Sequence, residues 1–421
     1  MATLRPFRAL RPDPAKAPEV AAVPYDVVNT AEARTLARGN PESFLHVSRP
    51  EIDLPDGTDP YADAVYRAAA ENFARVRRDA RFLKEEHPAL YVYRLRMGDH
   101  VQTGVAGCGS LAEYDADVVR KHERTRPDKE DDRTRHMLAL GAQTGPVFMT
   151  YRGRAEIDRL VERIVGDAPL YDFAAADGVS HTLWRATGAE AGELARHFEA
   201  VPLFYIADGH HRAASAARAR EELRGKSPSS GRAPYDEFLT VLFPADQLRI
   251  LPYNRIVRDL NGHTPAAFLG ALREKFAVRQ DAPATPQNKG EVSVYLDGAW
   301  HGLRIADGAP ADGGPIASLD VSLLQERVLE PMLGIRDVRT DKRIDFVGGI
   351  RGTAELEKLV SSGKASVAFS LFPVSLEELM TISDAGEIMP PKSTWFEPKL
   401  RDGLLIHEIA EPAMHEIAGP A

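Results

Sequence analysis

The sequence LFYIADGHHRAASAARAR, residues 203–220, contains two patterns that together predict a strand, a tight turn and a helix. Its first five residues are apolar and predict a short buried strand, whereas its Ala-rich second half predicts a helix. Asp208 is suited to cap that helix, and Gly209 gives the connecting turn its conformational freedom.

The first turn of this helix favours the binding of an anion. His210, His211 and Arg212 lie where unpaired backbone N–H groups and the positive end of the helix dipole coincide. A guanidinium can bind a phosphate or carboxylate through two hydrogen bonds, and histidines supply donors or a proton carrier near neutral pH. In the structural alternative, Arg212 forms an ordinary ion pair and the histidines cap the helix.

Length and composition limit the class of protein. A chain of 421 residues suggests two or three domains. With 53 Lys and Arg against 62 Asp and Glu, the net charge of -9 argues against a protein that coats nucleic acid. The single cysteine, Cys108, excludes an intramolecular disulfide and a multi-cysteine zinc site. Because no long apolar run or signal peptide is present, we expect a soluble, cytoplasmic protein without membrane partners.

Two segments near the N-terminus contain further candidates. Asp26 lies among apolar neighbours, where a carboxylate is costly unless it is paired or used; a turn-forming Asp is the alternative. Residues 44–48 predict a strand whose end would present His46 and Arg49 to one ligand, although as isolated residues both would be structural.

A charged segment, residues 120–133 (RKHERTRPDKEDDR), lies between a predicted strand and a predicted helix. Such a run commonly forms a solvated loop or helix face. It also contains the residue types that phosphate and magnesium sites use, and Glu123 is its first candidate. The candidate phosphate or nucleotide ligands of this segment are Arg124, Thr125, Lys129 and Arg133.

The segment EIMPPKSTWFEPK, residues 387–399, has an unusual composition for a connecting loop. Lys392, Ser393 and Thr394 could hold phosphate oxygens or a polar substrate. In the structural alternative, the two aromatic residues simply fill a gap in the core.

The remaining segments predict an α/β (α+β) protein with a mixed sheet. Linkers rich in Ala, Pro and Gln, around residues 281–289, indicate a second lobe. The predicted helices are 30–38, 61–85, 134–140, 155–164, 321–333 and 376–384, with a further helix that starts at residue 264 and ends before the linker at 281. The predicted strands and hairpins are 89–111, 144–151, 181–185, 238–244, 292–305 and 365–372.

Five strings occur in order along the chain: PYDVV (24–28), SFLHVSRPE (43–51), HERT (122–125), IADGHHR (206–212) and MPPKSTWFEPK (389–399). Together they resemble a bacterial and archaeal family known as domain of unknown function 1015, over nearly the whole chain. The predicted strand, turn and helix are also similar to the phosphate-binding turn of the ParB/sulfiredoxin superfamily, which includes ParB nucleotidases, sulfiredoxin and free serine kinases. In sulfiredoxin a catalytic cysteine precedes a His-Arg pair; His210 stands at that place here, so sulfinate repair is not expected.

These resemblances imply a ParB/sulfiredoxin-like catalytic domain over residues 1–260 and a smaller α+β lobe over residues 261–421, whose Lys392–Lys399 loop returns to the site. They imply a small-molecule phosphotransferase: a nucleotide-dependent kinase of free serine or a similar hydroxyl compound, with ATP or ADP as donor and Mg²⁺ held by Glu123 and Asp208. Arg212 and Gly209 would bind phosphate. The catalytic candidates are Asp26, Glu123, Asp208, His210 and His211.

Two other functions stay open at this point. The same residues could hydrolyse phosphoserine or a similar phosphomonoester. The chain could also be a nucleotide-switched DNA-binding protein like ParB, although its acidic balance and the lack of a helix-turn-helix with a basic recognition helix argue against nucleic acid. The oligomeric state, a homodimer included, is likewise open.

Overall fold

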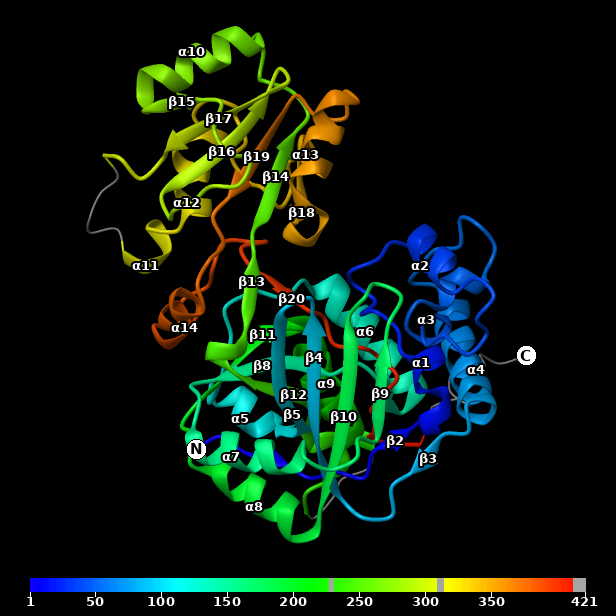
Figure 1. The fold of residues 1–421 in the computed structure, drawn as a ribbon. Helices are drawn as coiled ribbons and strands as arrows, with labels where there is room; N and C mark the ends of the chain where they lie inside the picture. Colours follow the sequence, from blue (N-terminus) through cyan, green and yellow to red (C-terminus); the bar gives the residue numbers. More distant parts are fainter. Residues whose placement is uncertain (227–230, 309–313, 412–421) are drawn as a thin grey trace. The chain divides into compact units, whose positions relative to one another are not determined.

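The computed structural model describes residues 1–226, 231–308 and 314–411, and the chain divides into two compact units (Figure 1). Unit 1 comprises Met1–Leu248 and Pro398–Ala421, and unit 2 comprises Arg249–Glu397. The expected division at residue 260 was therefore wrong in two respects. The strand after residue 252 pairs inside unit 2, and the C-terminal segment pairs inside unit 1, because backbone hydrogen bonds with distant strands decide both memberships.

Unit 1 is built on a nine-stranded mixed sheet, in the order β6-β11-β8-β12-β5-β4-β10-β9, with β1 also paired to β5. The β11–β6 and β12–β8 pairs are parallel, and the other pairs are antiparallel. The strands are β1 (Leu4–Arg5), β4 (Ala89–Met97), β5 (His100–Ser110), β6 (Val119–Arg120), β8 (Val147–Tyr151), β9 (Tyr171–Ala174), β10 (Ser180–Thr187), β11 (Phe204–Asp208) and β12 (Glu237–Pro244).

Two short ribbons complete the strands of unit 1. β2 (Leu10–Arg11) pairs with β3 (Leu83–Lys84), and β7 (Ala142–Gln143) pairs with β21 (His407–Glu408). The second ribbon attaches the C-terminal segment of the chain to unit 1.

Helix α7 places apolar residues against this sheet at helical spacing: Ile157, Leu160 and Ile164 are buried in one core cluster with residues of the strands. Helix α4 also buries one face, but its Phe73 and Val76 pack in a separate cluster of the N-terminal helices. Nearly all of β8, β11 and β12 is buried, which explains why these strands read as continuous apolar runs. The helices are α1 (Ala17–Val20), α2 (Thr30–Leu36), α3 (Leu45–Ser48), α4 (Asp63–Asp79), α5 (Leu111–Asp115), α6 (Pro127–Leu140), α7 (Ala155–Ile164), α8 (Gly188–Glu199) and α9 (His210–Lys226).

The predicted fold class is confirmed: a mixed sheet with helices, plus a smaller α+β unit. Two local predictions were wrong. The predicted strand 44–48 is instead helix α3, preceded by Phe44 at its N-cap. So short a segment, with three apolar residues, does not distinguish a strand from a helix, and Leu45 and Val47 both reach the core from the helix. Helix α6 begins at Pro127, seven residues earlier than predicted, since proline is favoured at the first helical position.

Unit 2 contains a six-stranded antiparallel sheet in the order β15-β17-β16-β19-β14-β18 (Figure 1). The predicted 321–333 helix is interrupted: α12 ends at Leu324, and a wider π-helical turn follows over Gln325–Leu329. The strands are β13 (Arg249–Leu251), β14 (Tyr253–Val257), β15 (Val278–Gln280), β16 (Glu291–Leu296), β17 (Ala299–Arg304), β18 (Ile344–Gly348), β19 (Val367–Leu371) and β20 (Trp395–Glu397), and the helices are α10 (Pro265–Lys275), α11 (Gly314–Ala317), α12 (Asp320–Leu324), α13 (Gly352–Ser361) and α14 (Leu376–Asp384). Among the described residues of both units, no helix has the length and apolar character needed to cross a membrane.

Candidate functional site

The predicted strand, turn and helix are β11, Gly209 and α9. Gly209 has φ +92°, a conformation that L-residues avoid, and its carbonyl accepts hydrogen bonds from the N–H groups of Arg212 (2.9 Å) and Ala213 (3.1 Å). Because α9 begins at His210, the capping position falls to Gly209, and the prediction that Asp208 caps the helix was wrong.

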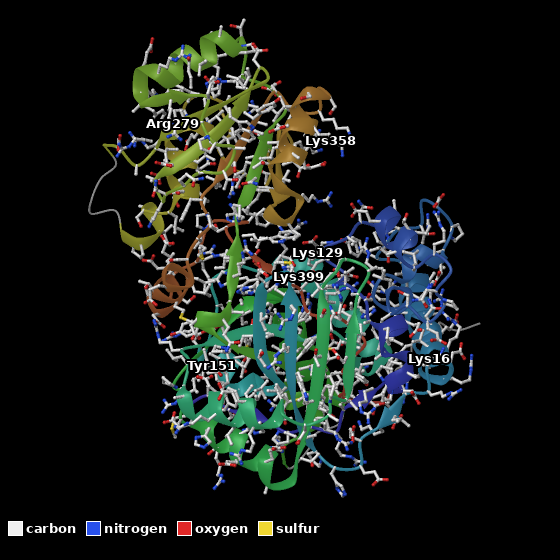
Figure 2. All side chains as sticks on the ribbon, viewed as in Figure 1. Lys16, Lys129, Tyr151, Arg279, Lys358 and Lys399 are labelled. Carbon is white, nitrogen blue, oxygen red and sulfur yellow. The ribbon has the colours of Figure 1, made fainter. Side chains whose placement is uncertain are left out.

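Asp208 instead pairs with Lys399, the last residue of the segment 392–399 that was expected to return to the site. Its Oδ2 accepts a hydrogen bond from Lys399 Nζ at 3.0 Å, and the Lys399 side chain is 10 % exposed (Figure 2). Burial alone would raise the pKa of Asp208, but the nearby Lys399 and Arg212 cations hold it well below its usual range. Asp208 is therefore a charged carboxylate between two buried cations.

Arg212 is buried and contacts several elements of unit 1. Its guanidinium donates to the carbonyl of Pro146 (2.7 Å) and to both oxygens of Asp26 (3.3 and 3.4 Å). Burial opposes its charge, yet Asp26 and two further carboxylates raise its pKa above the ordinary value. Its Nε has no hydrogen-bond partner among the described residues. Of the alternatives left open for Asp26, the structure shows the paired carboxylate, with Arg212 as its partner.

The two histidines of the turn contact the charged segment, residues 120–133. The Nε2 atom of His210 accepts a hydrogen bond from the N–H of His122 at 3.4 Å, and its Nδ1 lies 3.8 Å from Glu123 Oε2. Burial, with His122 beside it, lowers the pKa of His210 well below its usual range, so the ring is neutral at pH 7. Since Nε2 is an acceptor, the proton of the neutral ring lies on Nδ1, which faces Glu123. His211 Nε2 accepts from the N–H of Arg126 at 3.1 Å.

The phosphate candidates of the charged segment lie in different surroundings. Arg133 is half-buried, stacks over the Tyr25 ring at 4.3 Å and pairs with Asp132. Lys129 donates to the Tyr61 hydroxyl at 2.9 Å, Thr125 donates to Glu130, and Arg124 is exposed. Of the four, Arg133 shares a cavity with Arg212.

That cavity, about 40 Å³ in volume, is also lined by Asp402 and His136, neither of which the sequence indicated. Burial raises the pKa of Asp402 to about 7, although Arg212 and Arg133 oppose the shift. Its Oδ1 has no hydrogen-bond partner among the described residues. A cavity with room for about one water molecule, lined by a carboxyl and two guanidiniums, lies beside the turn.

The two candidates of residues 43–51 are engaged elsewhere. His46 Nδ1 lies 2.8 Å from Asp53 Oδ2, and its Nε2 lies 3.2 Å from the carbonyl of Asn40. Arg49 pairs with Glu51 at 2.9 Å. The expectation that both face one ligand depended on a strand; in the helix that is present, both side chains have partners within the N-terminal segment.

Lys392, Ser393 and Thr394 belong to unit 2. Lys392 is exposed and its Nζ lies 5.5 Å from the centre of the Tyr253 ring. Ser393 is buried and its Oγ donates to the carbonyl of Pro390 at 2.6 Å.

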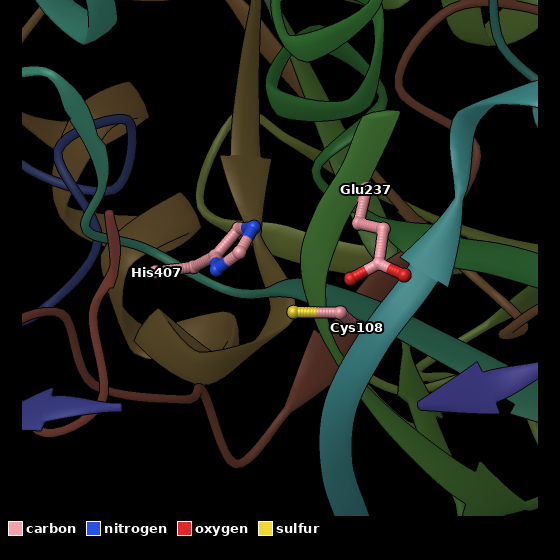
Figure 3. A group of neighbouring side chains, drawn as sticks. All are labelled: Cys108, Glu237 and His407. Atoms are coloured by element: carbon pink, nitrogen blue, oxygen red, sulfur yellow. The ribbon is translucent and has the colours of Figure 1, made fainter. Parts of the chain in front are cut away.

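One other cluster brings potential metal ligands together in unit 1. Cys108, Glu237 and His407 are buried with ligand atoms within 4.8 Å of one another (Figure 3). The Glu237 carboxylate already lies 3.5 Å from Arg5 and 3.3 Å from Arg232, and His407 Nε2 lies 2.9 Å from the carbonyl of Pro234. Burial raises the pKa of the Cys108 thiol well above its usual range, which disfavours the thiolate that a metal would need. Glu123 and Asp208 are not members of such a cluster within the described residues.

Fold and site together define a two-unit α/β protein with buried cations at a strand-to-helix turn. The family model for "Protein of unknown function (DUF1015)" matches residues 4–322, and the chain belongs to that family. A comparison with curated proteins found no match.

Several solved structures are similar to the chain. They include a free serine kinase in complex with AMP (12% identity, 73% of this chain and 91% of that chain, TM-score 0.37). They also include C-terminally truncated SbnI from Staphylococcus aureus (12% identity, 70% and 85% coverage, TM-score 0.38) and a conserved hypothetical protein from Pyrococcus furiosus (15% identity, 72% and 94% coverage, TM-score 0.34).

Proposed function

We propose that this protein is a small-molecule phosphotransferase, a nucleotide-dependent kinase of free serine or a similar hydroxyl compound. The observation that carries the proposal is the pair of buried cations, Arg212 and Lys399, that flank Asp208 at the N-terminus of α9. Phosphoryl transfer depends mainly on positioning and on neutralising the charge of the transferred group. Two cations at a helix N-terminus provide that electrostatic environment.

The acid–base role in this proposal falls to Glu123 and His210. Glu123 has a side chain that is 39% exposed, so a substrate hydroxyl can reach it, whereas His210 is buried behind it. Glu123 would accept the proton of the attacking hydroxyl, and the Nδ1–H of His210 would orient the carboxylate. His211, Asp26 and Asp208 then position the turn, and Arg124, Thr125, Lys129 and Arg133 stay predicted phosphate or nucleotide ligands.

A magnesium ion fits this arrangement in part. Mg²⁺ in nucleotide sites is held by one or two carboxylates together with the phosphates, and Glu123 offers an accessible carboxylate. Asp208 fits less well, because Lys399 already occupies its Oδ2. When bound, the ion would supply neutralisation of the phosphate charge, and either ATP or ADP would be the donor.

The proposed substrate-binding residues, in unit 2 and in the N-terminal segment, are assigned from sequence patterns. Lys392, Ser393 and Thr394 are proposed to bind the substrate, as are His46 and Arg49. If Lys392 has this role, Lys392→Ala should lower turnover strongly while the melting temperature of the unliganded protein stays the same.

The test is a direct assay for phosphoserine formation. The protein would be incubated with serine, Mg²⁺ and either ATP or ADP, and products would be quantified by mass spectrometry. Glu123→Gln should reduce turnover by roughly 10²–10⁴-fold, the usual contribution of a general base. Glu156→Gln, at the exposed start of α7, is the matched control and should retain full turnover.

The same experiment separates the alternatives. Phosphate release from phosphoserine without nucleotide would indicate a phosphatase. If neither reaction occurs with any of the hydroxyl amino acids, and DNA is retained on filters in a salt-dependent way, the ParB-like function replaces the kinase.

A further inference from the structure

Unit 2 contains a cavity of about 430 Å³ that the proposed phosphotransfer site does not use. Its volume lies in the range of small-molecule binding sites, roughly 300–1,000 Å³. Apolar side chains form part of its wall, among them Val321, Leu329 and Pro390. Its polar lining includes three arginines: Arg255, Arg336 and Arg339.

Arg255 is the unusual member of this lining. It lies in β14, a strand paired with both β18 and β19 (Figure 1). Its side chain is buried, with only 2 % exposure. A buried guanidinium is costly unless a carboxylate or another anion compensates its charge. Among the described residues, no carboxylate forms an ion pair with Arg255. Burial accordingly lowers its pKa to about 10.

Backbone groups hold the guanidinium in place. It donates to the carbonyl of Lys392 at 3.1 Å and to the carbonyl of Tyr253, and it lies over the Phe346 ring at 5.3 Å. These contacts orient the group but leave its charge uncompensated. The PPK motif of residues 390–392 thus supplies both a cavity wall and the carbonyl that fixes Arg255.

The charged side chains that line the cavity carry a net positive charge, because the three arginines outnumber the carboxylates. Two carboxylates, Glu326 and Asp337, also line the cavity. Asp337 is paired with Arg339 at 3.0 Å, which leaves Arg255 and Arg336 against Glu326.

A second, independent observation points to a ligand. Ser322 lines the same cavity and is 6 % exposed, and its Oγ has no hydrogen-bond partner among the described residues. The Oε1 atom of Gln325, one helical turn further, also lacks a partner in that part of the chain. Buried polar atoms are normally satisfied, so a hydroxyl and a carbonyl oxygen left open beside an uncompensated guanidinium indicate a place for a polar group.

We propose that this cavity binds a small organic oxyanion, whose phosphate or carboxylate group pairs with Arg255 and Ser322 and whose apolar body contacts the Val321, Leu329 and Pro390 wall. Gln325 Oε1 would accept a hydrogen bond from a hydroxyl or amino group of the same ligand. The site is made of unit 2 residues, so the inference does not depend on the proposed kinase activity.

Calorimetric titration of the full-length protein with phenyl phosphate tests the site. We expect saturable binding that is at least tenfold tighter than that of inorganic phosphate, which lacks the apolar body, and of phenol, which lacks the charge. Benzoate in place of phenyl phosphate distinguishes a carboxylate site from a phosphate site. Comparable binding of phenol would overturn the proposal.

Variants locate the binding. Arg255→Met should weaken phenyl phosphate binding at least tenfold, whereas Arg212→Lys, in the turn of unit 1, and Lys358→Met, on the exposed face of α13, should leave this binding event in place (Figure 2). Loss of binding in Arg212→Lys but not in Arg255→Met would place the ligand at the Asp208 turn and refute the inference. Serine kinase activity that persists in Arg255→Met, with binding lost, would separate the two sites.

The unliganded stability of Arg255→Met gives an additional readout. Removing an uncompensated buried charge should leave the melting temperature unchanged or raise it, whereas loss of a purely structural arginine should lower it. If this variant does not fold, Ser322→Ala and Arg336→Gln replace it, and each should weaken binding several-fold. Wild-type affinity in both would refute the site.

Discussion

Arg212 is the residue on which the proposed anion site depends most directly. Its guanidinium is oriented by the Pro146 carbonyl and by Asp26, so its remaining N–H groups have a defined direction. Lysine can keep the charge at this position but cannot reproduce the planar arrangement of donors. Charge alone is therefore not sufficient for the function that we propose.

Arg212→Lys should weaken nucleotide binding by roughly tenfold or more, because a hydrogen bond to a charged group contributes about 1.5–3 kcal/mol. Isothermal titration calorimetry with ADP measures the effect. Arg218→Lys is the matched control, since Arg218 lies on the same helix and pairs with Glu130 and Asp131 at the surface. Equal affinities for wild type and Arg212→Lys would remove Arg212 from the site.

Asp402 should make the stability of the protein depend on pH. Its folded-state pKa of about 7 lies above the ordinary 3.8, so the native state retains a proton that the unfolded chain releases between these values. This contribution to stability is complete below about pH 4 and is lost as the pH rises through 7.

In Asp402→Asn this contribution is absent, so the difference in unfolding free energy between wild type and variant should fall from pH 4 to pH 8. Urea unfolding at several pH values measures it. Burial lowers the pKa values of His122, His136 and His407, so their contribution to stability is lost as the pH falls. This contribution is the same in wild type and variant, so it cancels when their unfolding free energies are subtracted. A difference that does not vary with pH contradicts the shifted carboxyl.

Cys108 should be dispensable for catalysis. It is buried in β5, and burial disfavours its reactive thiolate form. Cys108→Ala should retain wild-type turnover in the phosphoserine assay. Complete loss of turnover in a variant with a native circular dichroism spectrum would show that the thiol takes part.

At the scale of elements, the turn between β11 and α9 requires a conformation that glycine adopts readily. A Cβ at Gly209 would meet Arg212 Nη1 at 3.4 Å and Val147 Cα at 3.5 Å, which is ordinary contact, so the cost of a side chain there comes from φ +92°. Left-handed conformations cost L-residues roughly 1–2 kcal/mol.

Gly209→Ala should therefore lower the free energy of unfolding by about 1–2 kcal/mol. Gly192→Ala is the control, and it should change the free energy of unfolding in the opposite direction. Gly192 lies inside α8 with open space around it, and alanine should stabilise that helix by about 0.5–1 kcal/mol. Denaturant unfolding compares them; equal effects would show that the strain at Gly209 is not significant.

At the scale of the whole molecule, each unit has its own sheet, and the boundary at Arg249 keeps β14 inside unit 2. A fragment of residues 249–397 should fold cooperatively. A fragment of residues 261–397 should not, because it lacks β14, which pairs with both β18 and β19. Thermal unfolding followed by circular dichroism compares the fragments, and cooperative unfolding of the shorter one would contradict the observed boundary.

The C-terminal segment has the same importance for unit 1. Ile406 exchanges backbone hydrogen bonds with Leu10, and Lys399 pairs with Asp208, 191 residues earlier in the chain. The membership of a segment in a unit thus follows from its pairing partners and not from its position in the sequence.

Local patterns were sufficient for several elements. The strand, turn and helix around Gly209, the β4–β5 hairpin and helix α7 could be predicted, because alternation, helical spacing and turn residues act over a few neighbouring positions. The pairing of Asp26 with the turn could be suspected from the cost of an isolated carboxylate. The short helix α3 could not, because three apolar residues within five positions fit either structure.

The partners and environments of the charged groups were decided by the tertiary structure. The sequence placed Lys399 in a loop of the site without indicating its partner, and Asp402 carries no local signal. The pairing of β21 with β7 holds their segment in unit 1, where Lys399 neutralises Asp208 and Asp402 lies buried near Arg212. The sequence around Arg255 likewise predicts only an ordinary strand residue. The strand is a central one because β14 pairs with both β18 and β19. Sequence alone determines local conformation from nearest neighbours; burial, which sets the energy of a charge, arises only when distant segments exclude water from it.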